Sequence, residues 1–494
     1  ARGRRRARRP GPPSAMGAEE RPAPGGDQAP AGAKGGEALV AFFTKLPAQF
    51  QVQEEPLVVP AHLARYGLSE VVNRLIGLEA PAPFDFLVDG EFLRTDLQAY
   101  LEARKLSSEK VLRLEYVLAL SEPEEKQVDE VPDWISSVVA LGSLPCPWFA
   151  ASSFDGAVRL YSAGAPRLTS RLADAGVTAL AALPVSGQGG DAAVGSSYLA
   201  AACKDGAVRS CLVEYGAEGA APAAGPVASL RASERMQALE AVALSERAEL
   251  LAGGGWDQDV LVWNAGAPLF ARPDEEAAGA GAAKRKAAGG GAECEAPKFV
   301  LKGHSQVVTC LEFGAPGRYP FTLLSGSWDC SVRVWDLPSA SCVCHWPVAR
   351  AVTSFSMSAA TPQLATSHED GHVSLWDIRA PPHPTVQGAL CLDSSAGLPL
   401  SSAQAPHRRL ASQVVWSPLD ANRLASVGHD GCLCVLDQRS PKMPMQRTRL
   451  GKPGPVPTKL LCVAWLGREE LAVGGSDGKV VRISLGQAAA PEDR

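Results

Sequence analysis

The sequence has little excess charge, no long apolar segment and no regular cysteine spacing. Its 494 residues carry a net charge of −5, which argues against a protein that coats nucleic acid with its whole surface but leaves room for local basic patches. The longest uncharged run, residues 135–154, contains Pro145 and Pro147, so soluble strands explain it better than a membrane span, and we expect no membrane partner. The 12 cysteines form no paired CxxC set and no secretory signal precedes them, which predicts reduced thiols in an intracellular protein.

The composition that is present favours β units and turns. Apolar residues make up 46% of the chain, with 48 Gly and 39 Pro, and this length exceeds one ordinary domain unless repeats hold it together. We expect residues 1–37 and 486–494 to be disordered tails. Residues 1–15 are expected not to be translated, with the start at Met16; the alternative makes Arg2 to Arg9 a basic nuclear-localisation or RNA-binding arm.

One pattern repeats seven times from residue 133 onward: an apolar strand, a turn with Asp, and a second strand, as in TLLSGSWDCSVRVWD (322–336). Five of the seven turn aspartates precede Gly, which suits a tight hairpin. These aspartates are Asp155, Asp205, Asp257, Asp329, Asp370, Asp430 and Asp477. The units resemble the WD-repeat family, so the sequence predicts a mainly β chain with a seven-bladed propeller over residues 133–485.

The fourth repeat carries the fullest signature of the WD family, with Gly303-His304, Asp329 and Trp335-Asp336. The resemblance implies that His304, Asp329 and Trp335 join a buried hydrogen-bond network that stabilises the blade. Most tryptophans at repeat positions are expected in blade cores rather than on partner surfaces; these are Trp256, Trp263, Trp328, Trp335 and Trp376.

Two segments of the repeat region need a separate account. The last repeat ends after its third strand, so a closing strand is expected between Tyr116 and Val131, within a linker of residues 121–132. An insertion at 265–297, rich in Ala, Gly and charge, predicts a disordered loop. Its Lys284-Arg285-Lys286 cluster is either a nuclear-import signal or solvated loop charge.

Residues 38–120 fit none of the repeats. ALVAFFTK and EPLVVP predict a strand pair, and YGLSEVVNRLIG has apolar residues at helical spacing. PFDFLVDGEFLR (83–94) predicts a hairpin turning at Asp89-Gly90. Thr95 is expected to cap a second helix with Gln98 in a capping box, before a last strand in KVLRLEYVLA. This order predicts a ubiquitin-like β-grasp domain.

The front-domain motifs RYGLSEVVNRLIG, PFDFLVDGEFLR and LSSEKVLRLEY, followed by DWISSV and seven blades, resemble the family of WD-repeat subunits of the pescadillo-containing ribosome-assembly complex, over residues 39–485. The resemblance implies a non-enzymatic factor for the large ribosomal subunit (pre-60S particle) and its rRNA maturation, in nucleolus and nucleoplasm. It implies that the propeller binds the block-of-proliferation protein, which binds pescadillo. The ubiquitin-like domain would be grasped by midasin, an AAA-type ATPase that strips the complex from the particle.

The same resemblance singles out Glu109, in LSSEK, as the contact with midasin. It implies that Glu109 supplies a carboxylate oxygen to a divalent cation, Mg²⁺, held by the partner, and that the chain has no cofactor of its own. From the residues alone, Glu109 is an ordinary solvated loop carboxylate.

Other functions remain as alternatives. A Notchless-type assembly factor joins a similar front domain to a propeller, but with eight blades, and a general WD-repeat scaffold or substrate receptor belongs to a different class. HEDGH (368–372) matches a zinc-protease motif, but Asp370-Gly371 would break the helix that such a site needs. GGSDGKV (474–480) lacks two residues of a phosphate-binding loop, and the pairs Cys342/Cys344 and Cys432/Cys434 fall within expected strands.

Overall fold

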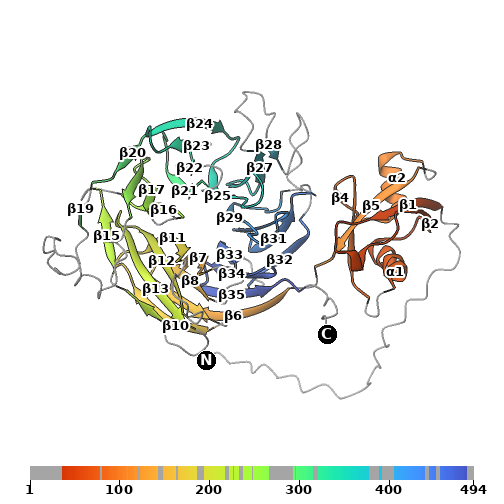
Figure 1. Ribbon diagram of the computed structural model, residues 1–494, viewed down its shortest axis with the longest axis horizontal. Coiled ribbons are helices and arrows are strands. Elements are labelled where there is room, and N and C mark those ends of the chain that lie inside the picture. The colour runs from red at the N-terminus through yellow and green to blue at the C-terminus, as the bar shows by residue number, and fades with distance from the viewer. Residues whose placement is uncertain are drawn as a thin grey trace, which may run out of the picture.

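The computed structural model describes most of the chain after residue 35. The described residues are 36–77, 81–107, 110–120, 123–142, 148–162, 165–185, 194–216, 222–225, 227–232, 237–246, 249–265, 293–294, 296–314, 321–377, 389–391, 405–439, 444–451 and 457–486. They form a small mixed domain beside a ring of antiparallel sheets (Figure 1). The predicted fold class is confirmed. No helix in the described part of the chain is long and apolar enough to cross a membrane.

The front domain is a five-stranded sheet with two helices on it. In chain order its elements are β1 (Glu37–Phe43), η1 (Ala48–Phe50), β2 (Pro56–Pro60), α1 (Arg65–Ile76), β3 (Phe84–Val88), β4 (Glu91–Phe92), α2 (Leu97–Arg104) and β5 (Leu112–Leu118). The sheet order is β2-β1-β5-β3-β4, with β1 and β5 parallel at its centre. This is the arrangement of a β-grasp domain.

Aromatic side chains fill the core of the front domain. Phe84 and Tyr116 meet edge to face with ring centroids 5.3 Å apart, and Phe42 and Phe86 pack beside them. The hydroxyl of Tyr116 donates to the Phe50 carbonyl at 2.6 Å, so its polar end is satisfied inside the core. Fully burying each such ring contributes roughly 1.5–3 kcal/mol.

The hairpin between β3 and β4 and the start of α2 test two local predictions. Asp89 and Gly90 have φ of 50° and 81°, which confirms the predicted tight turn. The capping prediction is wrong, because α2 begins one residue later than expected. Asp96, not Thr95, is the N-cap, and its carboxylate accepts from the backbone N–H of Ala99 at 2.6 Å.

Seven sheets follow in the described residues, one per repeat. The first three blades comprise β7 (Ile135–Ala140), β8 (Trp148–Ser153), β9 (Ala157–Ser162) and β10 (Ala165–Arg171); β11 (Val177–Pro184), β12 (Val194–Cys203), β13 (Val208–Gly216), β14 (Ala223–Ala224), β15 (Ala228–Arg231) and β19 (Glu293–Cys294); and β16 (Leu239–Leu244), β17 (Leu250–Gly255), β18 (Val260–Asn264) and β20 (Phe299–Leu301). Blades four and five comprise β21 (Val308–Phe313), β22 (Thr322–Ser327), β23 (Ser331–Asp336) and β24 (Ser341–Pro347); and β25 (Val352–Met357), β26 (Gln363–His368), β27 (Val373–Asp377) and β28 (Ala389–Cys391). Blades six and seven comprise β29 (Ala411–Trp416), β30 (Arg423–Gly428), β31 (Cys432–Asp437) and β32 (Gln446–Arg449); and β33 (Leu460–Trp465), β34 (Glu470–Gly475), β35 (Lys479–Ser484) and β6 (Glu124–Glu130).

Neighbouring blades pack face to face through their inner strands. Small residues allow this close approach: a Cβ on Gly326 of β22 would lie 2.6 Å from Cys310 Sγ and 2.9 Å from Val352 in the next blade. Leu324, Val352 and Phe355 bury the same contact. The second strand of each repeat therefore combines small and apolar residues.

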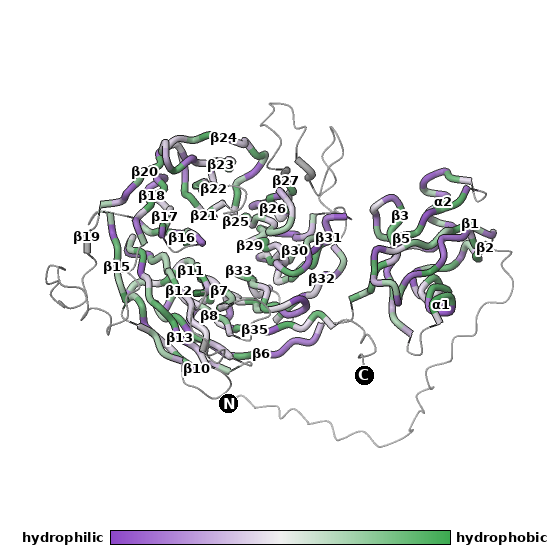
Figure 2. The backbone as a smooth tube through the Cα atoms, in the orientation of Figure 1, coloured by the Kyte–Doolittle hydropathy of each residue, from purple (hydrophilic) through white to green (hydrophobic). Residues whose placement is uncertain are grey.

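The ring is closed by a strand from the N-terminal side of the propeller. β6 pairs antiparallel with β35, from Glu124 opposite Ser484 to Glu130 opposite Lys479 (Figure 1). Figure 2 shows β6 as a largely hydrophilic outer strand, and five of its seven residues are exposed. It falls within the range expected for the closing strand, and Val131 beyond it is buried against blade one.

The insertion predicted to be disordered at 265–297 is structured at both its ends. Ala265 is buried and its N–H donates to the Glu249 carbonyl at 2.8 Å. Glu293 and Cys294 form β19, which pairs in parallel with β15 of blade two. Backbone pairing of this kind does not depend on side-chain pattern, which explains why composition missed it. Lys284-Arg285-Lys286 lies outside the described residues.

Candidate functional site

The predicted network of blade four is assembled around a serine. His304 Nδ1 lies 2.8 Å from Asp329 Oδ2, and His304 Nε2 lies 2.7 Å from Ser325 Oγ. The indole N–H of Trp335 donates to the same hydroxyl at 2.8 Å. Burial lowers the pKa of His304 despite the adjacent carboxylate. Sequence reasoning missed Ser325, although Thr366 and Ser426 stand at the same place in the next two repeats.

A second network occurs in blade six, where no tryptophan marks it. His407 lies 3.1 Å from Asp430 Oδ1 and 2.9 Å from Ser426 Oγ. Arg447 donates to the other oxygen of Asp430 at 2.8 Å. Although burial opposes ionisation, the bonds from His407 and from the backbone N–H of Arg408 lower the pKa of Asp430. The signal in the sequence was the position of His407 relative to Asp430, close to the spacing of His304 and Asp329.

The remaining turn aspartates find other partners in the same position. Asp155 pairs with Arg159 at 2.6 Å and Asp205 with Arg209 at 2.5 Å, each four residues on. Asp257 accepts the backbone N–H of Gln237, Asp370 pairs with Arg350 and His372, and Asp477 accepts the backbone N–H of Lys479. All seven aspartates therefore organise turns on one face of the ring, here called the turn face.

The enzyme-like motifs occupy structural positions. His368 and His372 flank a hairpin turn between β26 and β27, in which Gly371 has φ of 90° and His368 N–H donates to the His372 carbonyl. The two imidazoles of HEDGH therefore do not lie one turn apart on a helix, as a zinc-protease site requires. In the described part of the chain, no cluster of three or more His, Cys, Asp or Glu side chains is placed to hold a metal ion.

Two tryptophans of the turn face are exposed, contrary to the expectation of core positions. Trp256 and Trp328 are 44% and 41% exposed and meet edge to face with ring centroids 5.9 Å apart. They lie in turns of adjacent blades, and Trp256 is oriented by a 2.8 Å bond from its indole N–H to Glu240. Trp263 and Trp335 are buried as expected. An exposed aromatic pair on a rigid ring is typical of a protein-docking surface.

The front domain contacts blade six. Glu115 of β5 pairs with Arg439 at 3.2 Å, and the guanidinium of Arg94 donates to the Met445 carbonyl at 3.2 Å. The Met445 side chain packs on a small apolar cluster of the front domain that contains Phe92. We call this contact the blade-six joint. Arg439 and Met445 both lie between β31 and β32, and Figure 1 shows the front domain beside these strands. A Cβ on Gly90, in the hairpin turn, would lie 3.0 Å from the Arg439 carbonyl.

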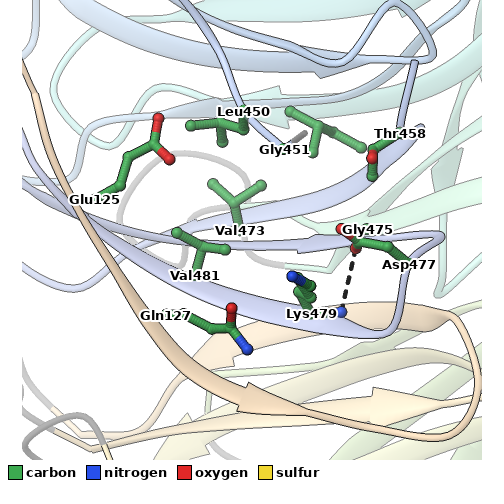
Figure 3. Close-up of a pocket in the computed structure, with 11 residues that line it drawn as sticks. Glu125, Gln127, Leu450, Gly451, Thr458, Val473, Gly475, Asp477, Lys479 and Val481 are labelled. Carbon is green, nitrogen blue, oxygen red and sulfur yellow. Dashed lines mark hydrogen bonds between the residues drawn. The ribbon is translucent and has the colours of Figure 1, made fainter. Parts of the chain in front are cut away.

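A cavity of about 370 Å³ lies between blades six and seven (Figure 3). Its lining mixes an acid and an amide of the closing strand, Glu125 and Gln127, with Lys479 and Val481 of β35. Asp477 accepts the Lys479 N–H at 3.2 Å, and burial raises the pKa of Glu125. This mixture gives the cavity no marked preference for anions or cations.

Glu109 lies outside the described residues, so its side chain has no structural account. The residues on either side are placed: Lys105 ends α2 in a left-handed conformation, and Lys110 N–H donates to the Ser107 carbonyl at 3.2 Å. Leu101 of α2 and Leu112 of β5 are both buried in the core. Both flanks of Glu109 are therefore anchored to the rigid part of the front domain.

Comparison with known proteins agrees with this architecture. Residues 38–101 match the NLE (NUC135) domain, and residues 295–336 and 338–377 match the WD domain, G-beta repeat. The chain is thus an NLE-domain protein with a WD-repeat propeller.

Curated relatives resemble the chain over both parts. A ribosome biogenesis protein WDR12 homolog of Chlamydomonas reinhardtii is 34% identical over 460 residues, which cover 89% of this chain and 96% of the relative. A WDR12 homolog of Oryza sativa subsp. japonica is 28% identical, covering 89% and 95%, and ribosome biogenesis protein ytm1 of Aspergillus fumigatus is 28% identical, covering 89% and 90%. The chain belongs to the WDR12/Ytm1 family of ribosome biogenesis proteins, which confirms the family resemblance of its front-domain motifs.

Proposed function

We propose that this chain is a non-enzymatic assembly factor for the large ribosomal subunit and its rRNA maturation, acting in nucleolus and nucleoplasm. The observation that carries the proposal is the continuous similarity of both parts of the chain to curated ribosome biogenesis proteins, over 89% of its length. In this proposal the propeller docks on the block-of-proliferation protein, which holds pescadillo. The front domain is the handle that the ATPase midasin pulls.

The handle works through Glu109, which supplies an oxygen to a Mg²⁺ ion held by midasin. Hard divalent cations take carboxylate oxygens, and an ion with an open position can accept one from a partner. The buried Leu101 and Leu112 anchor the two elements that flank Glu109, so a load at this point reaches the core of the domain rather than a free loop.

Such a load enters the propeller by two routes. One is covalent: β5 of the front domain continues within a few residues into β6, the closing strand of blade seven. The other is the blade-six joint, through Glu115–Arg439 and Met445. Because blade six takes part of the load, the joint protects the pairing of β6 with β35 from being peeled by the pull.

The exposed pair Trp256 and Trp328 is the surface best suited to the protein partner of the propeller. Central aromatic residues contribute most of the binding energy in many interfaces. Trp328→Ala is expected to weaken capture of the block-of-proliferation protein by roughly 2 kcal/mol or more. Phe321→Ala is the matched control, since Phe321 is an exposed aromatic residue, at 67%, at the opposite end of β22 from Trp328.

The handle is tested with purified protein and the midasin adhesion domain in the presence of Mg²⁺. Glu109→Ala and Glu109→Asp are expected to abolish or strongly weaken binding while propeller docking is unchanged. Glu102→Ala is the matched control, because Glu102 is an exposed carboxylate on α2 whose side chain bonds only Gln98 among the described residues. Full binding by Glu109→Ala would contradict the proposed grip.

The role in ribosome assembly is tested by affinity purification and mass spectrometry. Pescadillo, the block-of-proliferation protein and precursors of the large subunit are expected with the wild-type chain. Recovery of a ubiquitin ligase without ribosome precursors would instead identify a substrate receptor.

A further inference from the structure

Blade six carries a concentration of arginine that neither the family nor the proposed docking explains. Four arginines line a cavity of about 420 Å³: Arg408 and Arg409 from the loop before β29, and Arg447 and Arg449 from β32. The acid in its lining is Asp430, which is buried and already bonded to His407 and Arg447. The cavity is therefore cationic in a chain whose net charge is −5.

Three of these guanidinium groups are available to a ligand. Within the part of the chain that the structure describes, the side chains of Arg408, Arg409 and Arg449 make no ion pair or hydrogen bond, and all three residues are exposed. Arg447 is held in place by Asp430, which fixes one wall of the cavity. A planar guanidinium donates two parallel hydrogen bonds to an anionic phosphate, so this set matches a phosphate chain.

The positive region continues along the turn face to an exposed aromatic ring. Pro457 also lines the cavity, and Lys459 follows it two residues further along the chain. Burial lowers the pKa of His429, and the charges of Lys459 and Arg409 lower it further. The ammonium of Lys459 in turn lies 5.5 Å from the ring centre of Trp134, which is 42% exposed. Lys459 thus connects the cationic cavity of blade six with the partly exposed indole of Trp134.

Another aromatic ring and another cation continue this region into blades one and two. The rings of Trp134 and Phe154 are 6.4 Å apart, and Lys204 Nζ lies 3.9 Å from the centre of the Phe154 ring. Cations of blades six and seven are therefore followed by two aromatic rings, Trp134 and Phe154, and then by Lys204 in blade two. This is the combination found where proteins bind single strands, since phosphates follow cations while bases stack on rings.

We propose that this strip, defined by Arg408, Arg409, Arg447, Arg449, Lys459 and Trp134, binds single-stranded RNA. The arginines of blade six hold phosphates, and Trp134 stacks a base. The choice of RNA over an acidic peptide rests on the exposed ring of Trp134, which a carboxylate chain would not use, and on the proposed function, since RNA is the polyanion of a ribosome precursor. The contact needs no base sequence, because phosphates and ring faces are common to all nucleotides.

The test is fluorescence anisotropy with full-length protein and a labelled single-stranded RNA of about 15 nucleotides, a length that fills one such site. Salt is varied to obtain the slope of log K against log salt. Arg409→Ala with Arg449→Ala is expected to weaken binding about tenfold and to reduce the slope by about 1.4, since each lost phosphate contact contributes about 0.7 for a single strand. Arg167→Ala with Lys126→Ala, which removes two exposed charges from outer strands of blades one and seven, is expected to change neither value greatly.

The aromatic part is tested separately. Trp134→Ala is expected to weaken RNA binding about fivefold or more without changing the salt slope, and Trp134→Tyr to restore it. Thermal unfolding followed by circular dichroism checks that each variant is folded. Ultraviolet cross-linking of wild-type protein should place the RNA on the peptide that contains Trp134.

Two results would overturn the proposal. One is equal loss of affinity in the arginine pair and in the Arg167/Lys126 control, which would mean diffuse attraction to any cation. The other is displacement of RNA by a polyglutamate peptide at equal charge, with no effect of Trp134→Ala, which would identify an acidic protein segment as the occupant. RNA binding and its competition by polyglutamate are measured with purified components. Their failure can therefore be distinguished from failure to recover pescadillo, which would contradict the proposed function.

Discussion

Removal of the closing strand is the perturbation for which the structure gives the clearest magnitude. We compare two shortened chains that both lack the front domain. One begins at residue 123 and keeps β6; the other begins at residue 132 and lacks it. The first retains all four strands of blade seven, whereas the second exposes the whole edge of β35.

The expected loss follows from the contacts of β6. Six residue pairs align it with β35, and Val131 N–H also donates to the Gly478 carbonyl at 2.8 Å. An antiparallel ladder has about one hydrogen bond per residue pair. At a net value of about 0.5–1.5 kcal/mol for each bond, the six pairs contribute roughly 3–9 kcal/mol to the free energy of unfolding. Burial of Val131 adds about 1.5–3 kcal/mol, and the hydroxyl of Tyr161 donates to Asp129 at 2.9 Å. Since the free energy of unfolding of a protein is about 5–15 kcal/mol, loss of β6 removes most of the stability of the propeller.

The assay is urea unfolding followed by tryptophan fluorescence, because Trp148 and Trp465 lie in the cores of blades one and seven. The chain from residue 123 should unfold cooperatively. The chain from residue 132 should unfold at much lower urea or aggregate, and a synthetic peptide of residues 123–132 should restore stability in proportion to its concentration. Equal midpoints for the two chains would refute the reasoning, since the ring would then be closed without β6.

Three further changes test other parts of the structure. Burial raises the pKa of Glu312 from 4.5 to about 8, so between these pH values the folded protein keeps a proton that the unfolded chain has lost. The free energy of unfolding should therefore fall as pH rises from 5 to 8. In urea denaturation measured across that range, Glu312→Gln should show a weaker dependence on pH. Ser325→Ala removes the hydroxyl that His304 and Trp335 share as a hydrogen-bond partner and should cost about 2–4 kcal/mol in urea unfolding; a cost near zero would mean that the network is not stabilising. Met445→Glu places a charge on the apolar side of the blade-six joint, and small-angle X-ray scattering should show a larger radius of gyration with unchanged thermal unfolding; an unchanged radius would show that the joint does not hold the domain.

Local features of the fold could be predicted from the sequence. The turn at Asp89-Gly90 and the Asp-Gly turns of the blades depend on two or three neighbouring residues, so short stretches of sequence are enough to predict their conformation. The closing strand could be placed because an unpaired edge of β35 needs a partner. The error at Thr95 has the same local origin, since Asp96 is an equally good cap one residue on.

Features that depend on residues far apart in the chain could not be predicted. His407 reaches Asp430 and Ser426 only once the blade is folded, and the third member of the usual set, the tryptophan, is absent. The contact of Trp328 with Trp256 joins two adjacent blades, so neither repeat reveals it alone. The contact of Glu115 with Arg439 joins residues more than 300 positions apart, which no periodicity reveals.

The origin of β6 has a consequence for the protein while it is being made. The ribosome releases β6 long before β35, so the growing chain carries a completed outer strand with nothing to pair it until the last blade emerges. Throughout that interval the strand edge can be captured by another nascent chain, and translation that stops short of β35 leaves it open permanently. Its acidic and basic side chains, exposed on both faces of the edge, keep the waiting strand soluble until the ring can close.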